Sequence, residues 1–329
     1  MGNFFTLISI ENMKLWKRIS AKVMIIIIVA IVILATGIFK YYTVSNNVSN
    51  TTTVSENWKP DLQKKVSAEK IQLKQLENST SKLPVLQIGS TKKIIAEDEY
   101  RINNNVKPES KINIWAGVMY IYSKGFNALI ILFVVIACTA SVAGEFSEGT
   151  MKMMIPRPYR RHEILSAKLI AIIIYGIALL ATTFVLIFLF WGVFFGFHGI
   201  NAKEMIWTSG SISYIPAALK SLVLLGLDFL QAIVFIIVAF AISAISRSRS
   251  IATGFSIFLV VIGSSIMASL AEFFTWGKYL PFATTSFATY ITTGTIVVGT
   301  SLSFALIMSL LYSLVFCFLG YFVFQKRDI

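Results

Sequence analysis

Six long apolar stretches divide the sequence, and each is close to the length that a membrane-spanning helix requires. A bilayer core is crossed by about 20 apolar residues in an α-helix. Charged residues are rare inside these stretches and gather between them. The sequence therefore predicts an all-α polytopic membrane protein, with six transmembrane helices at residues 23–39, 126–143, 165–195, 219–245, 251–270 and 301–324.

The composition agrees with a chain that is largely surrounded by lipid. Of the 329 residues, 56% are hydrophobic and only 14% are charged, and the mean hydropathy is +0.74. Soluble globular chains carry about 25% charged residues, so this chain has too few to cover a water-exposed surface. The composition excludes an intrinsically disordered chain, a disulfide-stapled secreted fold and a protein whose main role is to bind nucleic acid.

The basic residues of the short connections predict how the chain is oriented in the cell membrane. One set of connections, together with the chain ends, carries 13 Lys and Arg residues against five acidic ones, whereas the opposite short loops hold few basic residues. Cytoplasmic loops are enriched in Lys and Arg. Both termini are therefore predicted to be cytoplasmic, which agrees with an even number of spans. The segments between spans are predicted to be cytoplasmic (1–22, 144–164, 246–250 and 325–329) or extracellular (40–125, 196–218 and 271–300).

Two of the extracellular segments are unusual. The insert of residues 40–125 is a long loop, and long loops are translocated to the outer side largely regardless of their charge. Its stretch PDLQKKVSAEKIQLKQLEN has the apolar spacing of an amphipathic helix. Residues 281–300 are too polar to face lipid and too apolar for a loop in water. A re-entrant helix buried against other helices satisfies both facts, so one is predicted before the last span.

The cytoplasmic loop between the second and third spans carries an unusual combination of residues. Two acids, Glu145 and Glu148, are spaced to share a helix face, and a methionine-rich apolar patch follows them. Such a surface suits docking to a partner that moves. An ordinary positive-inside anchor is the alternative, and it explains the basic residues but not the acids or the methionines. The candidate docking residues are Glu145, Glu148, Gly149, Thr150, Met153, Met154, Pro158, Arg160, Arg161 and Lys168.

One acidic residue, Asp228, lies well inside a predicted span. Intramembrane acids are costly and face the protein interior or water, and Gln231 lies three residues further on the same helix face. The pair fits either a substrate or ion contact on a translocation path or a hydrogen-bonded contact between helices. Asp228 is expected to be buried against another helix, either neutral or hydrogen-bonded to groups such as Gln231, and not in a tight ion pair, because no basic residue of the neighbouring short loops lies at its depth.

Catalytic motifs are not found. The phosphate-binding pattern Gly-x-x-x-x-Gly-Lys-[Ser/Thr] does not occur in the sequence. The two histidines and two cysteines have no spacing that predicts a hydrolytic triad or a metal site. The chain is therefore predicted to be a non-catalytic membrane subunit that binds no cofactor itself.

The loop and the two chain ends together resemble the ABC-2 type permeases, the membrane subunits of a class of ATP-binding-cassette transporters. The order Glu145-x-x-x-Gly149-Thr150, an apolar run, Pro158-x-x-Arg161 and Lys168 is similar to the cytoplasmic loop of that family. The segment ENMKLWKR resembles its amphipathic interface helix, and the ending Phe-x-Lys-Arg-Asp-Ile resembles its C-terminal tail. The interface-helix residues are Glu11, Lys14, Lys17 and Arg18. The large insert is similar to that of permeases from Gram-positive bacteria, some of them associated with bacitracin or lantibiotic resistance and some with sodium export.

The resemblance implies an exporter of a peptide, an antibiotic, a lipid-like compound or an ion. A separate cytoplasmic ATPase dimer would bind ATP and Mg and would dock on two permease copies, or on this permease and a related one. Glu145 and Arg161 would belong to the docking loop. Two other functions stay open at this stage. One is a secondary, ion-coupled transporter that uses Asp228, and the other is a membrane sensor that detects antimicrobial peptides through its extracellular insert.

Overall fold

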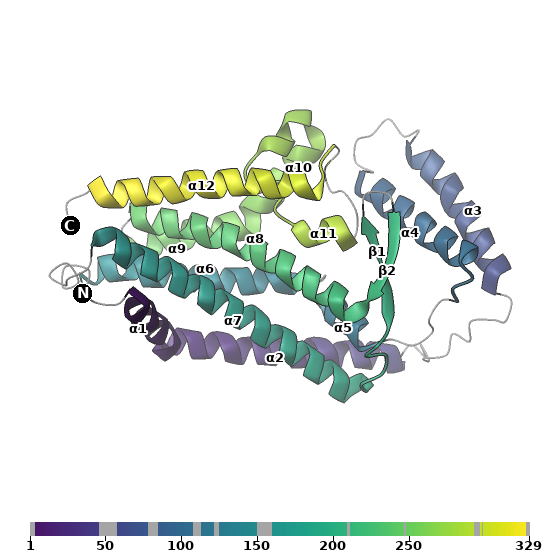
Figure 1. Cartoon of the computed structure of the whole chain (residues 1–329), viewed down its shortest axis with the longest axis horizontal. Helices are drawn as coiled ribbons and strands as arrows, with labels where there is room; N and C mark the ends of the chain where they lie inside the picture. Colours follow the sequence, from purple (N-terminus) through teal and green to yellow (C-terminus); the bar gives the residue numbers. More distant parts are fainter. Residues whose placement is uncertain are drawn as a thin grey trace.

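Among the residues that the computed structural model describes, six helices are long and apolar enough to cross a membrane, which confirms the predicted number. The structure describes residues 4–45, 58–77, 85–107, 113–121, 125–149, 160–208, 211–246, 248–292, 297 and 299–326. The two chain ends lie together at one end of the helical bundle, and the large insert lies at the other (Figure 1). These are called the termini end and the insert end below.

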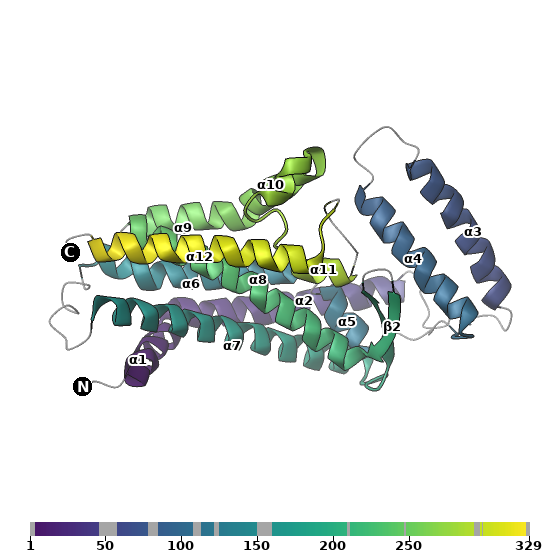
Figure 2. The ribbon, with the colours of Figure 1, turned by 45° about the horizontal axis from the view of Figure 1, so that its top comes forward.

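The six helices extend beyond the predicted apolar stretches, because a helix continues through the polar boundary of the bilayer. They are α2 (Ile19–Ser45), α6 (Asn127–Ser147), α7 (Arg161–Phe195), α8 (Ala217–Ser246), the continuous α9 (Arg249–Phe258), η3 (Leu259–Gly263) and α10 (Ser264–Phe273), and α12 (Leu302–Lys326). The element η3 is a π-helical turn. Figure 2 shows α10 turned away from the line of α9, as expected where a π-helical turn interrupts an α-helix.

The centre of the bundle is formed by α6, which packs against α8, α9 and α7. It is the most buried of the six spans, and its polar residues face other helices. The hydroxyl groups of Thr139 and Thr253 lie 2.9 Å apart and join α6 to α9. By contrast, α12 turns many of its large apolar side chains outward, toward the space that lipid would fill.

A short helix, α1 (Phe4–Lys17), precedes the first span at the termini end. A break at Arg18 separates it from α2, and Figure 2 shows the two helices at an angle. Leu7, Glu11 and Leu15 are buried at four-residue intervals, so one face of α1 packs on α7. The segment expected to be an interface helix is therefore helical and docked on the bundle.

Two helices of the insert, α3 (Trp58–Glu77) and α4 (Val85–Asn103), pack side by side (Figure 1). Their ion pairs include Lys65 with Asp98 at 3.0 Å and Lys70 with Glu99 at 2.6 Å. The sequence predicted α3 but did not single out α4. A third helix, α5 (Ile114–Ile121), packs on α7 and α8, so this part of the predicted extracellular insert belongs to the bundle.

One element departs from the all-α prediction. The loop predicted between α7 and α8 contains an antiparallel hairpin of β1 (Lys203–Thr208) and β2 (Ser211–Pro216). The start of β2 alternates polar and apolar residues, as expected for a strand, whereas β1 has three consecutive apolar residues, Met205, Ile206 and Trp207. A 3₁₀ turn, η4 (Thr275–Tyr279), precedes the predicted re-entrant residues 281–300. Within them lies a short helix, α11 (Phe287–Thr292), which packs on α8, α12 and β1.

Candidate functional site

Four charged side chains meet at the termini end, where α1, α6 and α7 come together. The Nζ atom of Lys168 lies 2.7 Å from Oε2 of Glu11 and 2.7 Å from Oε2 of Glu145. The Nζ atom of Lys14 lies 2.7 Å from Oε1 of Glu11 and 3.8 Å from Oε1 of Glu145. The side chain of Lys168 is 0% exposed and that of Glu11 is 2% exposed. We call these four residues the charge cluster.

The charge cluster balances two ammonium groups with two carboxylates. Burying a charge costs several kcal/mol unless a partner of opposite sign lies close by, and here each buried charge has one. Burial alone raises the pKa of Glu11, but Lys168 and Lys14 outweigh burial and hold that pKa below its ordinary value of 4.5. Glu11 is therefore ionised at neutral pH, and its charge fastens α1 to α7.

The lowered pKa of Glu11 predicts how stability depends on pH. A carboxyl group whose pKa is lower in the folded state contributes stability that is complete above its unfolded pKa and lost as the pH falls through the folded pKa. The free energy of unfolding of the wild type should therefore decrease as the pH falls below 4.5. In Glu11→Gln this decrease should be smaller, because the amide does not titrate.

Unfolding titrations in mixed micelles above and below pH 4.5 would measure this effect. Glu148→Gln is the matched control, because the Glu148 side chain is 61% exposed and should leave the pH dependence unchanged. If Glu11→Gln keeps the full pH dependence of the wild type, the carboxylate of Glu11 does not hold α1.

The other predicted docking residues lie nearer the surface or outside the described residues. Glu148 and Arg249 are both exposed and approach each other to 3.9 Å. Gly149 has a φ of +70° and follows the end of α6. Arg160, Arg161 and Lys17 are exposed, and Arg18 lies at the break between α1 and α2. The predicted docking residues Thr150, Met153, Met154 and Pro158 lie outside the described residues.

The structure thus divides the predicted docking residues into two groups. Glu145 and Glu148, expected to share a helix face, differ in exposure because α6 ends at Ser147 and Glu148 follows its last helical residue. Glu145 and Lys168 are buried and do not present a contact surface. They connect the start of the loop to α1, a link that sequence reasoning missed because the partners lie 157 residues apart. The one indication of this link in the sequence was that Lys168 lies inside a predicted apolar span.

A cavity of about 300 Å³ lies between α5, α6, α8 and α11. Asp228 is 5% exposed, and its Oδ1 accepts a hydrogen bond of 2.7 Å from Nδ2 of Asn127 on α6. The same Nδ2 donates to Oε1 of Gln231 at 2.9 Å. Asp228 is thus buried against another helix and joined to Gln231 through Asn127. The residues that line the cavity are Met119, Gly125, Asn127, Ala128, Leu224, Asp228, Gln231, Ser286, Ala288, Thr289 and Thr292.

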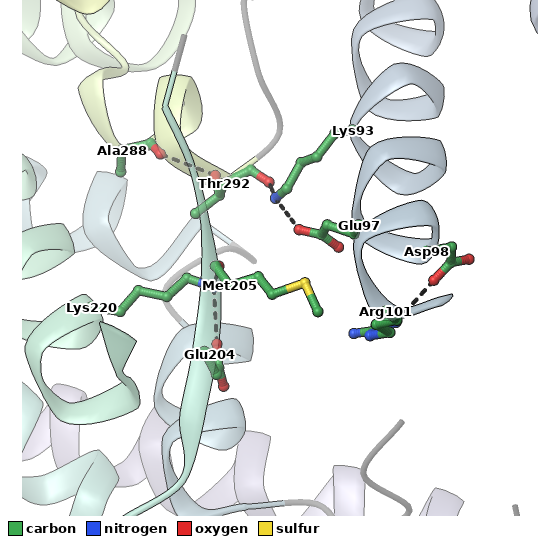
Figure 3. A network of polar contacts seen from close by, with 9 residues as sticks. All are labelled: Lys93, Glu97, Asp98, Arg101, Glu204, Met205, Lys220, Ala288 and Thr292. Atoms are coloured by element: carbon green, nitrogen blue, oxygen red, sulfur yellow. Dashed lines mark hydrogen bonds and ion pairs between the residues drawn. The ribbon is translucent and has the colours of Figure 1, made fainter. Parts of the chain in front are cut away.

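The insert contacts the wall of this cavity directly (Figure 3). Lys93 of α4 donates a hydrogen bond to the backbone oxygen of Thr292, at the end of α11, and lies 3.6 Å from Glu97. Burial lowers the pKa of Lys93, and the nearby charge of Lys220 adds to this effect. Lys220 itself donates to Glu204 and to the backbone oxygen of Met205, both at 2.9 Å. The insert, the hairpin and the cavity wall therefore form one connected unit.

The fold defines the class of the protein, a helical multi-pass membrane protein, and one relative is also described as a membrane protein. Residues 92–329 match a family described as a protein of unknown function, DUF2705, and the chain belongs to this family. It is 31% identical over 283 residues to the uncharacterized protein YhcI of Bacillus subtilis (strain 168), across 84% of this chain and 85% of that protein. It is 26% identical over 211 residues to the uncharacterized membrane protein YdbK of the same organism, across 63% of this chain and 81% of that protein.

Proposed function

We propose that the chain is the permease subunit of an ATP-binding-cassette exporter in the cell membrane, driven by a separate cytoplasmic ATPase dimer. The observation that carries this proposal is the charge cluster, which joins α1, α6 and α7 where the loop between α6 and α7 begins. A partner that moves this loop would therefore move three helices together. The resemblance of the loop and chain ends to ABC-2 type permeases supports the same function.

The proposal assigns a direction to the bundle. The termini end faces the cytoplasm, where the basic residues of the short connections gather, and the insert end faces outward. In this arrangement α1 is the interface helix, and α11 belongs to a re-entrant segment that enters the outer half of the membrane. The ATPase binds ATP and Mg, and this chain binds neither. A second copy, or a related permease, completes the transporter.

The buried and exposed residues of the termini end have different roles in this proposal. The exposed charges Glu148, Arg160 and Arg161 contact the ATPase, together with the loop that follows α6. The buried Glu145 and Lys168 keep the loop attached to α1 and the spans. Movement of the ATPase is thereby transmitted by a rigid, charge-paired connection and not by a flexible one.

Reversing the charge of Arg161 tests this assignment. Arg161→Glu should leave the protein inserted and folded, because Arg161 is exposed, but should reduce the stimulation of the ATPase by at least about tenfold, since a like-charge contact replaces an attractive one. The measurement is the ATP hydrolysis rate of a candidate ATPase subunit from the same organism, with each permease variant in lipid nanodiscs.

Lys278→Glu provides the matched control, since it makes the same charge change at the insert end. It should retain full stimulation of the ATPase. Wild-type stimulation by Arg161→Glu would show that the loop is only a membrane anchor. An ion-coupled transporter that uses Asp228 would need no ATPase, so stimulation by the wild type also separates the two functions.

A further inference from the structure

The polar side chains around the cavity are one carboxyl group, two amides and three hydroxyl groups. Among the described residues that line it, Asp228 is the one that carries a carboxyl group, and no lining residue is basic. The nearest lysine along α8, Lys220, is already paired with Glu204 and Met205. The hydroxyl groups of Ser286 and Thr289 add further oxygens from the side of α11. The cavity is therefore electrostatically suited to a positively charged group.

Asn127 supplies a second, independent indication. Its amide nitrogen must face the carboxylate, which only accepts hydrogen bonds when ionised, and it donates to both Asp228 and Gln231. Its amide oxygen, Oδ1, is buried and accepts no hydrogen bond from any described residue. A buried acceptor without a donor costs about 1–3 kcal/mol. A ligand that donates a hydrogen bond to Oδ1 of Asn127 would also lie near the Asp228 carboxylate, because Asn127 is hydrogen-bonded to Asp228.

We propose that this cavity binds the primary ammonium group of an organic compound, between Asp228 and Asn127. An ammonium group has three N–H donors and one positive charge, which matches one carboxylate and one unsatisfied amide oxygen. The inference deepens the proposed function, because it names the class of compound that the exporter would carry.

The size and lining of the cavity favour an organic cation over a metal ion. A divalent ion usually takes several carboxylate or carbonyl ligands, and no group of three or more His, Cys, Asp or Glu side chains suited to a metal is found among the described residues. A volume of about 300 Å³ is within the range of small-molecule sites. Met119, Leu224 and Ala288 provide apolar contacts for the carbon skeleton that bears the ammonium group.

The contact between the insert and α11 gives the cavity an outer boundary. Thr292 lines the cavity and also receives the hydrogen bond from Lys93 of α4. The position of α11 therefore depends on the insert as well as on α8. A compound that enters the cavity from the membrane or from the insert side would reach the acceptor groups of Asp228 and Asn127.

Calorimetric titration of the purified full-length chain in nanodiscs, without any ATPase, tests the inference. The probe is 2-phenylethylammonium, and the matched ligand is 2-phenylethanol, which has a similar shape but neither the charge nor the ammonium donors. We expect saturable binding of the amine at one site per chain and at least about tenfold weaker binding of the alcohol. Sodium chloride, titrated alone, distinguishes an inorganic cation site.

Three variants locate the site. Asp228→Asn keeps the shape of the side chain and should weaken amine binding by at least about tenfold. Asn127→Ala should weaken it by several-fold. Ser243→Ala is the control: it removes a buried hydroxyl group on α8 that donates to the backbone oxygen of Ala239 and does not line the cavity. This variant should bind the amine like the wild type.

Absence of saturable amine binding, equal binding of the alcohol, or saturable binding of sodium alone would each overturn the inference. So would an Asp228→Asn variant with wild-type affinity. If that variant does not fold, the comparison of ligands on the wild type decides. Failure of amine binding beside an intact ATPase complex would refute this inference only, whereas amine binding without any ATPase complex would refute the proposed function only.

Discussion

Replacing Lys168 with Met should lower the free energy of unfolding by about 3–5 kcal/mol. The substitution leaves the carboxylates of Glu11 and Glu145 together in a buried site, near the partly exposed Lys14. Removing one partner of a buried ion pair is costly because the remaining charge stays desolvated. Reversible unfolding in mixed micelles, followed by tryptophan fluorescence, would measure the change.

Two further proteins control this experiment. Lys17→Met removes an exposed lysine from the same region and should change stability by no more than about 0.5 kcal/mol. Adding Glu11→Gln and Glu145→Gln to Lys168→Met removes the unpaired charges and should recover much of the loss. Equal stability of Lys168→Met and Lys17→Met would contradict the charge cluster as the link between α1 and the bundle.

Gly117→Ala should lower the free energy of unfolding by about 1–3 kcal/mol, although it adds a single methyl group. Gly117 lies on α5, and a Cβ atom placed there would come within 1.9 Å of Cδ2 in the Trp191 ring. Trp191 is buried on α7, so the ring cannot move into open space and α5 must shift instead. Because Met119 of α5 lines the cavity, weaker binding of 2-phenylethylammonium should accompany the loss of stability.

Gly226→Ala is the matched control for this substitution. A Cβ atom at Gly226, on α8, would meet no heavy atom within 4 Å, and alanine favours a helix over glycine by about 1 kcal/mol. Gly226→Ala should therefore be as stable as the wild type or more stable. If Gly117→Ala behaves in the same way, the close approach of α5 to Trp191 does not position the cavity wall.

The spans could be predicted from the sequence because each depends on the summed hydropathy of about 20 neighbouring residues. The charge cluster could not, because its partners come from α1, α6 and α7 and are set by packing. Glu145 and Lys168 were predicted to be residues of a docking loop, whereas both are buried. The hydrophobic pattern of a span does not tell which of its polar residues face another helix.

Two features at the insert end show the same limit. Asn127 was visible only as a polar interruption in the second span, yet it bridges Asp228 and Gln231. The hairpin was predicted as a loop, although Ser-Gly, a turn signal, separates Lys203–Thr208 from Ser211–Pro216. Local turn chemistry could have indicated the hairpin, but the position of Asn127 required the packing of α6 on α8.

Native mass spectrometry of the purified complex tests the central claim most directly. The chain would be co-expressed with a candidate ATP-binding-cassette ATPase from the same organism and released from membranes under conditions that preserve subunit contacts. Our account predicts an assembly of two ATPase subunits with two membrane subunits, lost in Arg161→Glu and retained in Lys278→Glu. A chain that is released without the ATPase, in the presence and absence of ATP, would contradict the account.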